Sequence, residues 1–216
     1  MTRKNPYAKP DRFTKEAKQA GFPARSVYKL EEIDRRVRLL RPGMHVLDLG
    51  AAPGSWSLYV AQKIGRPGKL LAVDLQPLAI TLPPPGKFIL GDALELNPPD
   101  FSMGPASESG AFDSRGILAE YAPYDVVLSD MAPSTTGNRF TDQTRSFDLF
   151  MRALAVAVAL TKPGGTFVGK IFMGEDLALA RAELRKHFEN ERLIRPEGTR
   201  TVSYELFVIG LGRRAP

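Results

Sequence analysis

The sequence contains no cysteine and only two histidines among its 216 residues. Without cysteine the chain has neither disulfides nor thiolate metal ligands, and His45 and His187 are too isolated to suggest a metal site. No segment has the roughly 18 uninterrupted apolar residues that would span a bilayer. The run from Met1 to Lys18 alternates basic and polar residues, without the apolar core of a secretory signal. We therefore expect a metal-independent, cytoplasmic protein without a membrane segment.

Short apolar runs alternate with segments of helical periodicity along the chain. The predicted strands span residues 44–49, 69–73, 88–90, 125–129, 166–172 and 204–211, and the predicted helices span residues 23–37, 56–64, 145–160 and 176–188. Near-continuous apolar strands separated by helices are typical of a parallel sheet that is covered on both faces. We predict a Rossmann-like, doubly wound α/β fold with a mostly parallel sheet. Residues 97–123, rich in proline, glycine and serine, are predicted to form a long connection.

The net charge is +6, and the positive excess is concentrated near the beginning of the chain. We predict a basic arm over residues 1–22, followed by a single domain over residues 23–216. Clustered cations are expected of a protein that binds a polyanion, because each phosphate contact releases counterions. Aromatic side chains lie among these cations and could stack on unpaired bases, which favours RNA over the alternative of a solvated basic tail. These aromatic residues are Tyr7, Phe13, Phe22 and Tyr28, and the cations of the arm include Lys4, Lys9 and Arg12.

A loop of small residues, Asp-Leu-Gly-Ala-Ala-Pro-Gly-Ser-Trp, spans residues 48–56 between the first predicted strand of the sheet and the helix after it. Gly50 and Gly54 would let the backbone pass close to a ligand. Their spacing differs from Gly-x-Gly-x-x-Gly, so a nicotinamide-dependent oxidoreductase is disfavoured. Trp56 has two interpretations: it packs near the ligand, or it fastens the helix to the sheet.

Acidic residues stand at the ends of four predicted strands. In an open α/β sheet, ligands bind outside the carboxyl ends of the strands, so these acids are candidates for a shared site. Asp74 could accept hydrogen bonds from both ribose hydroxyls of an adenosine, and Asp92 could accept one from the adenine amino group. Each acid alone could equally be a helix cap or a solvated loop end. The four are Asp48, Asp74, Asp92 and Asp130.

Five motifs together resemble the RrmJ/FtsJ family of ribosomal RNA methyltransferases. They are Arg25-Ser26-Val27-Tyr28-Lys29-Leu30, the loop from Asp48 to Trp56, Ser129-Asp130-Met131-Ala132-Pro133, Gly169-Lys170-Ile171-Phe172 and Ser203-Tyr204-Glu205-Leu206. The resemblance implies a class I methyltransferase that uses S-adenosyl-L-methionine to methylate a ribose 2′-hydroxyl, that of a uridine in 23S ribosomal RNA. It implies large-subunit ribosomal RNA as the partner, and no obligate protein partner is evident. The cofactor-binding residues it implies are Gly54, Trp56, Asp74, Asp92 and Asp130.

The same resemblance implies a catalytic tetrad of Lys29, Asp130, Lys170 and Glu205. A ribose hydroxyl is a poor nucleophile, so it must be held in line with the methyl group while a nearby base takes its proton. Burial and neighbouring positive charge favour the neutral form of a lysine, and Lys170 is our candidate base. Lys29 would stabilise negative charge on the oxygen, Asp130 would orient Lys170, and Glu205 would hold a lysine or the ribose.

Two other functions are compatible with these motifs. Relatives with the same tetrad methylate ribose in transfer RNA, although the short chain without a C-terminal extension favours ribosomal RNA. A catalytically silent RNA-binding protein could also keep this fold, and the intact tetrad argues against that alternative.

Overall fold

The computed structural model describes residues 12–93, 118, 121–197 and 203–215. Its described residues build one mixed sheet with strand order β3-β2-β1-β4-β5-β7-β6. The strands are β1 (His45–Leu49), β2 (Lys69–Asp74), β3 (Gly86–Leu90), β4 (Tyr124–Ser129), β5 (Thr161–Phe172), β6 (Phe188–Ile194) and β7 (Glu205–Arg213). The helices are α1 (Arg12–Gln19), α2 (Val27–Val37), α3 (Ser55–Ile64), α5 (Arg139–Leu160) and α6 (Leu177–His187).

The sheet is parallel from β3 through β5, and β7 then inserts antiparallel between β5 and β6. The prediction of a doubly wound, mostly parallel sheet is confirmed. Strand order reverses between β1 and β4, so the carboxyl ends of these two strands diverge into loops that leave in opposite directions along the sheet. Ligand sites of such folds form at this point.

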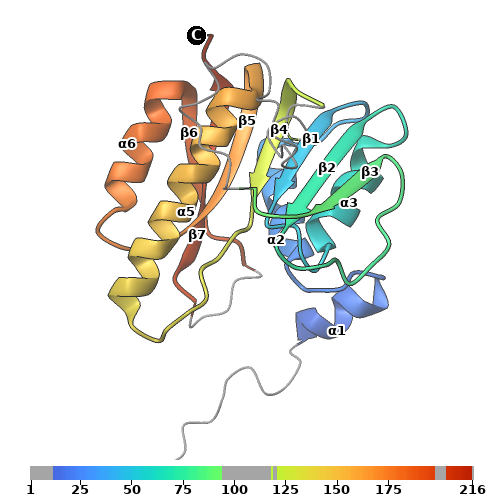
Figure 1. The fold of residues 1–216 in the computed structure, drawn as a ribbon, viewed down its shortest axis with the longest axis horizontal. Helices are drawn as coiled ribbons and strands as arrows, with labels where there is room; N and C mark the ends of the chain where they lie inside the picture. Colours follow the sequence, from blue (N-terminus) through green and yellow to red (C-terminus); the bar gives the residue numbers. More distant parts are fainter. Residues whose placement is uncertain (1–11, 94–117, 119–120, 198–202, 216) are drawn as a thin grey trace, which may run out of the picture.

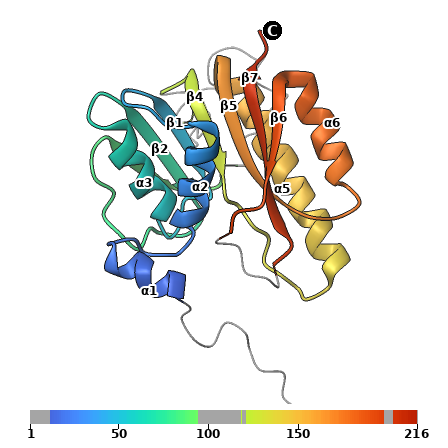
Figure 2. The same cartoon turned by 180° about the vertical axis from the view of Figure 1, so that it is seen from behind.

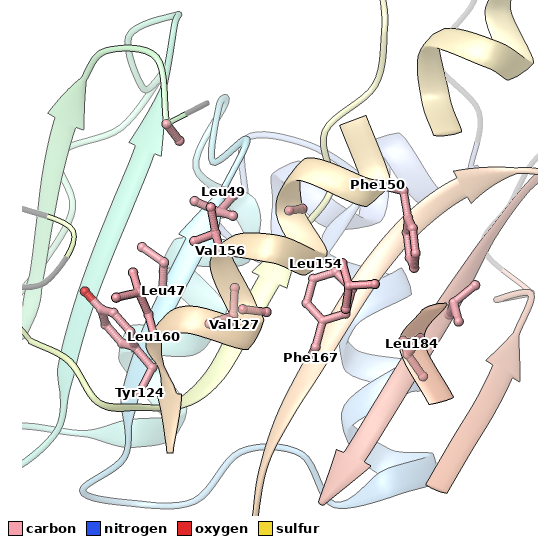
Figure 3. Close-up of a cluster of buried hydrophobic side chains, with 14 of the residues drawn as sticks. Leu47, Leu49, Tyr124, Val127, Phe150, Leu154, Val156, Leu160, Phe167 and Leu184 are labelled. Carbon is pink, nitrogen blue, oxygen red and sulfur yellow. The ribbon is translucent and has the colours of Figure 1, made fainter. Parts of the chain in front are cut away.

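Helices cover both faces of the sheet. Helices α5 and α6 lie on the face toward the viewer in Figure 1, whereas α2 and α3 lie on the opposite face, which Figure 2 shows from behind. Each face has its own buried cluster. Figure 3 shows the α5 side, where Phe150, Leu154 and Val156 of α5 meet Val127 and Phe167 of the sheet.

Several predicted boundaries were wrong, and two elements were missed. Helix α5 begins at Arg139 rather than at residue 145. The Asn138 side chain caps it by accepting a 3.2 Å hydrogen bond from the Thr141 N–H. The prediction missed these first turns because they are polar and show no apolar pattern. Strand β5 begins five residues before its predicted start, pairing at Thr161 with β4. Strand β6 was predicted partly as helix; it is an edge strand in which only Phe188 and Ile194 are buried, so its charged middle gives no strand-like pattern.

Helix α1 lies within the segment predicted as a basic arm. Its one buried residue, Ala17, packs in the cluster on the α2 side, and the Phe13 ring lies 5.8 Å from the Tyr28 ring. The division into an arm over 1–22 and a domain over 23–216 stays a prediction. Lys4, Tyr7 and Lys9 lie outside the described residues, as does most of the connection over residues 97–123.

The buried Phe150 side chain leads to a prediction about the stability of the fold. Phe150 is 1% exposed and packs edge-on against Phe167 at a centroid distance of 5.6 Å. We expect Phe150→Ala to lower the free energy of unfolding by about 3–5 kcal/mol, because the cavity it leaves is enclosed by the sheet. Urea unfolding measures this effect.

Phe140 provides a matched control on the same helix, because its side chain is 70% exposed. Phe140→Ala should change the free energy of unfolding by no more than about 0.5 kcal/mol. Equal losses in the two variants would contradict the placement of α5 on the sheet.

Candidate functional site

The small-residue loop after β1 passes close to the ends of its neighbours. Gly50 and Ala51 donate backbone hydrogen bonds of 3.0 and 3.2 Å to the Val73 carbonyl at the end of β2. Gly50 has φ +77°, and a Cβ there would lie 2.6 Å from the Met131 side chain. Glycine is therefore required on both conformational and steric grounds, and the loop borders a concave surface.

A pocket of about 510 Å³ opens at this edge of the sheet. Its lining comes from the end of β2, from the segments after β1, β2, β3 and β4, and from the middle of α5. The residues that matter for its chemistry are Gly50, Asp74, Asp92 and Asp130, with Leu149 and Arg152 from α5. Three of the predicted cofactor-binding acids are thus brought together, and α5 adds two residues that the sequence did not single out.

Asp74 has a defined orientation in this pocket. Its Oδ2 accepts a 2.8 Å hydrogen bond from the Ala52 N–H, and its Oδ1 accepts one of 2.8 Å from the Gln76 N–H. Each carboxylate oxygen has a second acceptor site, so Asp74 can still receive the two hydroxyls of a ribose. The donor set, the glycine-bordered surface and the adjacent acids fit an adenosine-containing cofactor with a positive charge.

Gly54 and Trp56 do not line this pocket. Gly54 has φ +109° and stands at the N-cap of α3, and the Trp56 side chain is 3% exposed. The Trp56 ring lies 5.5 Å from the Phe207 ring, and its Nε1 donates a 2.8 Å hydrogen bond to the Ser26 carbonyl. The packing therefore favours the second interpretation of the indole, and a cofactor contact at either residue stays a prediction that would involve the backbone.

Ser55 strengthens the same connection. Its Oγ accepts a 2.8 Å hydrogen bond from the Ala24 N–H and donates one of 3.0 Å to the Ala24 carbonyl. Together with the Trp56 bond, three hydrogen bonds fasten the start of α3 to residues 24–26. The small-residue loop over residues 48–56 is therefore coupled directly to the segment that precedes Lys29.

Asp48 is buried beneath the loop rather than in the pocket. Ser57 Oγ donates a 2.6 Å hydrogen bond to its Oδ2, and its Oδ1 has no hydrogen-bond partner among the described residues. Burial raises the pKa of Asp48 from 3.8 to about 7; the Ser57 hydrogen bond opposes this shift, and the charges of Asp130 and Asp74 add to it. Asp48 is thus a structural acid whose protonation matters near neutral pH.

The four predicted tetrad residues form two ion pairs. Lys170 Nζ donates a 2.8 Å hydrogen bond to Asp130 Oδ1 and another to the Asp130 carbonyl. Lys29 on α2 forms an ion pair with Glu205 Oε1. All four side chains are largely buried, with exposed fractions of 6% for Lys170, 16% for Asp130 and 12% each for Lys29 and Glu205.

Strand register explains why these residues meet. Lys170 pairs with Phe207, and Glu205 lies two residues before Phe207 on β7, so Lys170 and Glu205 point to the same face of the sheet. Phe207 packs against Trp56 on the face that α2 covers, which brings Lys29 over Glu205. Asp130 follows β4, the other neighbour of β5, and reaches Lys170 from that side.

Sequence reasoning missed Asp142, which shapes the loop that leads from Asp130 to α5. Its Oδ1 accepts hydrogen bonds of 2.8 and 2.9 Å from the N–H and Oγ1 of Thr136, and its Oδ2 accepts one of 3.3 Å from Gly137. The backbone hydrogen bond from Thr136 is the main cause that lowers the pKa of Asp142. The Thr-Gly-Asn stretch before a helix start was the available signal.

A second pocket, of about 530 Å³, lies near α1, α2 and α3. Its buried carboxylates already serve the fold: Asp34 accepts from the Tyr59 hydroxyl at 2.9 Å, and Glu32 accepts from the Glu197 N–H at 2.8 Å. The pocket beside Asp130 is therefore the better candidate site. No helix in the described part of the chain is long and apolar enough to cross a membrane.

The fold and the pocket define an α/β protein with a candidate ligand site at the switch point of its sheet. Residues 22–213 match the family described as FtsJ-like methyltransferase. Two relatives are called ribosomal RNA large subunit methyltransferase E. The protein from Sorangium cellulosum is 59% identical over 98% of this chain and 92% of its own length, and that from Bdellovibrio bacteriovorus is 42% identical over 96% and 99%.

A solved structure is also similar in fold. A ribosomal RNA methyltransferase structure from Plasmodium falciparum superposes with a TM-score of 0.72 at 21% identity, covering 90% of this chain and all of that one. The chain belongs to the FtsJ-like methyltransferase family, and it is a methyltransferase.

The buried acid predicts a pH effect on stability. Between pH 3.8 and about 7 the folded protein keeps a proton on Asp48 that the unfolded chain loses, so this group makes stability fall as pH rises. Asp48→Asn removes the titration but keeps the shape. We expect the stability of the variant relative to the unmodified protein to increase across this pH range.

Urea unfolding of both proteins at a series of pH values measures the difference. Parallel stability curves would show that Asp48 titrates as it does in the unfolded chain.

Proposed function

We propose that this methyltransferase transfers a methyl group from S-adenosyl-L-methionine to a ribose 2′-hydroxyl in large-subunit ribosomal RNA, at a uridine of the 23S RNA. The observation that most directly supports this proposal is that Asp130 lines the pocket and also accepts a hydrogen bond from Lys170. A group bound in the pocket and a hydroxyl beside Lys170 would therefore be close enough to react. The bound cofactor supplies an electrophilic methyl group on a positively charged sulfur.

The pocket residues would hold the cofactor in distinct ways. Asp74 would accept hydrogen bonds from the ribose hydroxyls of the cofactor, and Asp92 would accept one from its adenine amino group. Asp130 would face the positively charged part, where its negative charge is favourable. Trp56 would contribute through its backbone N–H in the first turn of α3. Gly54, whose own N–H donates a 2.7 Å hydrogen bond to the Ala51 carbonyl, would let the cofactor approach the backbone closely.

The tetrad would act on the RNA. Lys170 is the proposed base: once its ammonium group has lost a proton, Nζ can accept the proton of the 2′-hydroxyl as the oxygen attacks. Asp130 fixes Nζ through two hydrogen bonds and so acts on Lys170 by positioning it. Lys29 would stabilise negative charge on the attacking oxygen, and Glu205 keeps the Lys29 ammonium in place.

Charge and relatives support ribosomal RNA as the substrate. The net charge of +6 suits a polyanion, and exposed arginines continue along the chain from the end of α2, at Arg35, Arg36, Arg38 and Arg41. The relatives from Sorangium cellulosum and Bdellovibrio bacteriovorus carry the name of a large-subunit ribosomal RNA methyltransferase. Acting on ribosomal RNA, the enzyme would work in the cytoplasm, on RNA within the large subunit.

Substituting Lys170 by alanine tests the chemistry. We expect Lys170→Ala to reduce methyl incorporation roughly 10²–10⁴-fold, because the base is lost, while cofactor binding remains. The assay uses labelled S-adenosyl-L-methionine and large ribosomal subunits from cells that lack the protein. Calorimetry measures cofactor affinity in the same preparations.

Lys162 is the matched control, because it lies on the same strand, pairs with Asp125 and is far from the pocket end of β5. Lys162→Ala should methylate at the normal rate. Near-normal turnover by Lys170→Ala would contradict the assignment of Lys170 as the base. Absence of methyl incorporation by the unmodified protein with any RNA would contradict the proposed function.

A further inference from the structure

An aromatic and cationic surface adjoins the tetrad on its outer side. The Arg139 guanidinium lies 5.2 Å from the centroid of the Tyr204 ring, and Tyr204 directly precedes Glu205 on the chain. The centroid of the Phe172 ring lies 4.8 Å from that of the Tyr204 ring. Phe140, the residue after Arg139, projects into solvent with 70% of its surface exposed. We call Arg139, Phe140, Phe172, Met173 and Tyr204 the rim cluster.

Hydrogen bonds fix the rim cluster relative to the catalytic strands. The Met173 N–H donates a 2.8 Å bond to the Tyr204 carbonyl, and the Gln143 side chain donates to the Met173 carbonyl. The Phe172 N–H donates a 3.0 Å bond to Ser146 Oγ. The first turns of α5 are therefore attached to the end of β5 that carries Lys170, and Phe140 is held on a rigid helix rather than on a loop.

Burial of apolar area does not explain Phe140. A phenyl ring exposed to this degree contributes little to the fold, and its neighbour Arg139 forms a stack with Tyr204 and no ion pair within the described residues. An exposed phenyl ring on the residue next to Arg139 offers a stacking face for a base, and the Arg139 guanidinium offers a charge for its phosphate. A protein partner of this surface would be expected to need more exposed apolar area than Phe140 and the 39% exposed Met173 provide.

We propose that Phe140 stacks on an unpaired nucleobase of the RNA strand that carries the target ribose, and that Arg139 binds a phosphate of the same strand. The proposal rests on the proposed function and deepens it: the enzyme selects a nucleotide that lies outside a continuous helix. A base inside a duplex has both faces covered by its neighbours and could not reach the phenyl ring.

Fluorescence anisotropy with a labelled, single-stranded oligouridylate tests the proposal. We expect Phe140→Ala to weaken binding roughly 5- to 100-fold, as deletion of a base-stacking aromatic does. Phe140→Tyr should bind nearly as well as the unmodified protein, and Phe140→Leu, which keeps an apolar side chain without an aromatic face, should resemble Phe140→Ala. Because phenylalanine carries no charge, the slope of affinity against salt concentration should stay the same, whereas Arg139→Gln should reduce it.

Two further measurements separate stacking from other effects. In Phe140→Trp the new indole emission should be quenched by oligouridylate and not by inorganic polyphosphate, which supplies charge without bases. Leu179→Ala, which removes a 61% exposed apolar side chain from α6 at the outer edge of the molecule, should bind like the unmodified protein.

Unchanged binding by Phe140→Ala would overturn the proposal, as would normal binding by Phe140→Leu or equal quenching by polyphosphate. Methyl incorporation by the unmodified protein is measured separately on large subunits. Absence of incorporation would contradict the proposed function. Normal incorporation together with unchanged oligouridylate binding by Phe140→Ala would contradict the stacking contact alone and leave the proposed function intact.

Discussion

The position of the Asp130 carboxylate is the constraint on which the rest of the site depends. This residue lines the pocket beside β1 and β2, and its Oδ1 accepts a hydrogen bond from the buried Lys170 ammonium. A lysine that is only 6% exposed on its side chain is costly unless a partner compensates its charge. Because one residue both lines the pocket and accepts hydrogen bonds from Lys170, it fixes the position of the Lys170 ammonium relative to the pocket.

The supporting structure serves this arrangement from the other face of the sheet. Ser55 and Trp56, at the start of α3, hydrogen-bond to residues 24–26, and α2 begins immediately afterwards with Lys29 in its first turn. Hydrogen bonds and the ion pair therefore connect the small-residue loop over residues 48–56 with α2 and, through Lys29, with Glu205. A displacement of the loop would be expected to move Lys29 with it, which gives a physical reason for a buried tryptophan at this position.

The sequence predicted the architecture well where apolar patterns were strong, as in β1, β2 and β4. It placed Asp48, Asp74, Asp92 and Asp130 at one edge because parallel strands end together. The structure brings the last three to one pocket, whereas Asp48 is fully buried and does not line it. Bringing Lys29 and Glu205 together required a resemblance, since the antiparallel insertion of β7 is a long-range pairing that no local pattern encodes. Polar elements were missed for a related reason: α1 buries a single alanine, β6 has a charged middle, and Asp142 acts through hydrogen bonds to a turn.

Mapping of ribose 2′-O-methyl groups in the RNA of cells that lack this protein tests the central claim most directly. The account predicts that one nucleotide of the large-subunit ribosomal RNA loses its methyl group, and that the unmodified protein restores it while Lys170→Ala does not. An unchanged map of that RNA, or a loss confined to transfer RNA, would contradict the account.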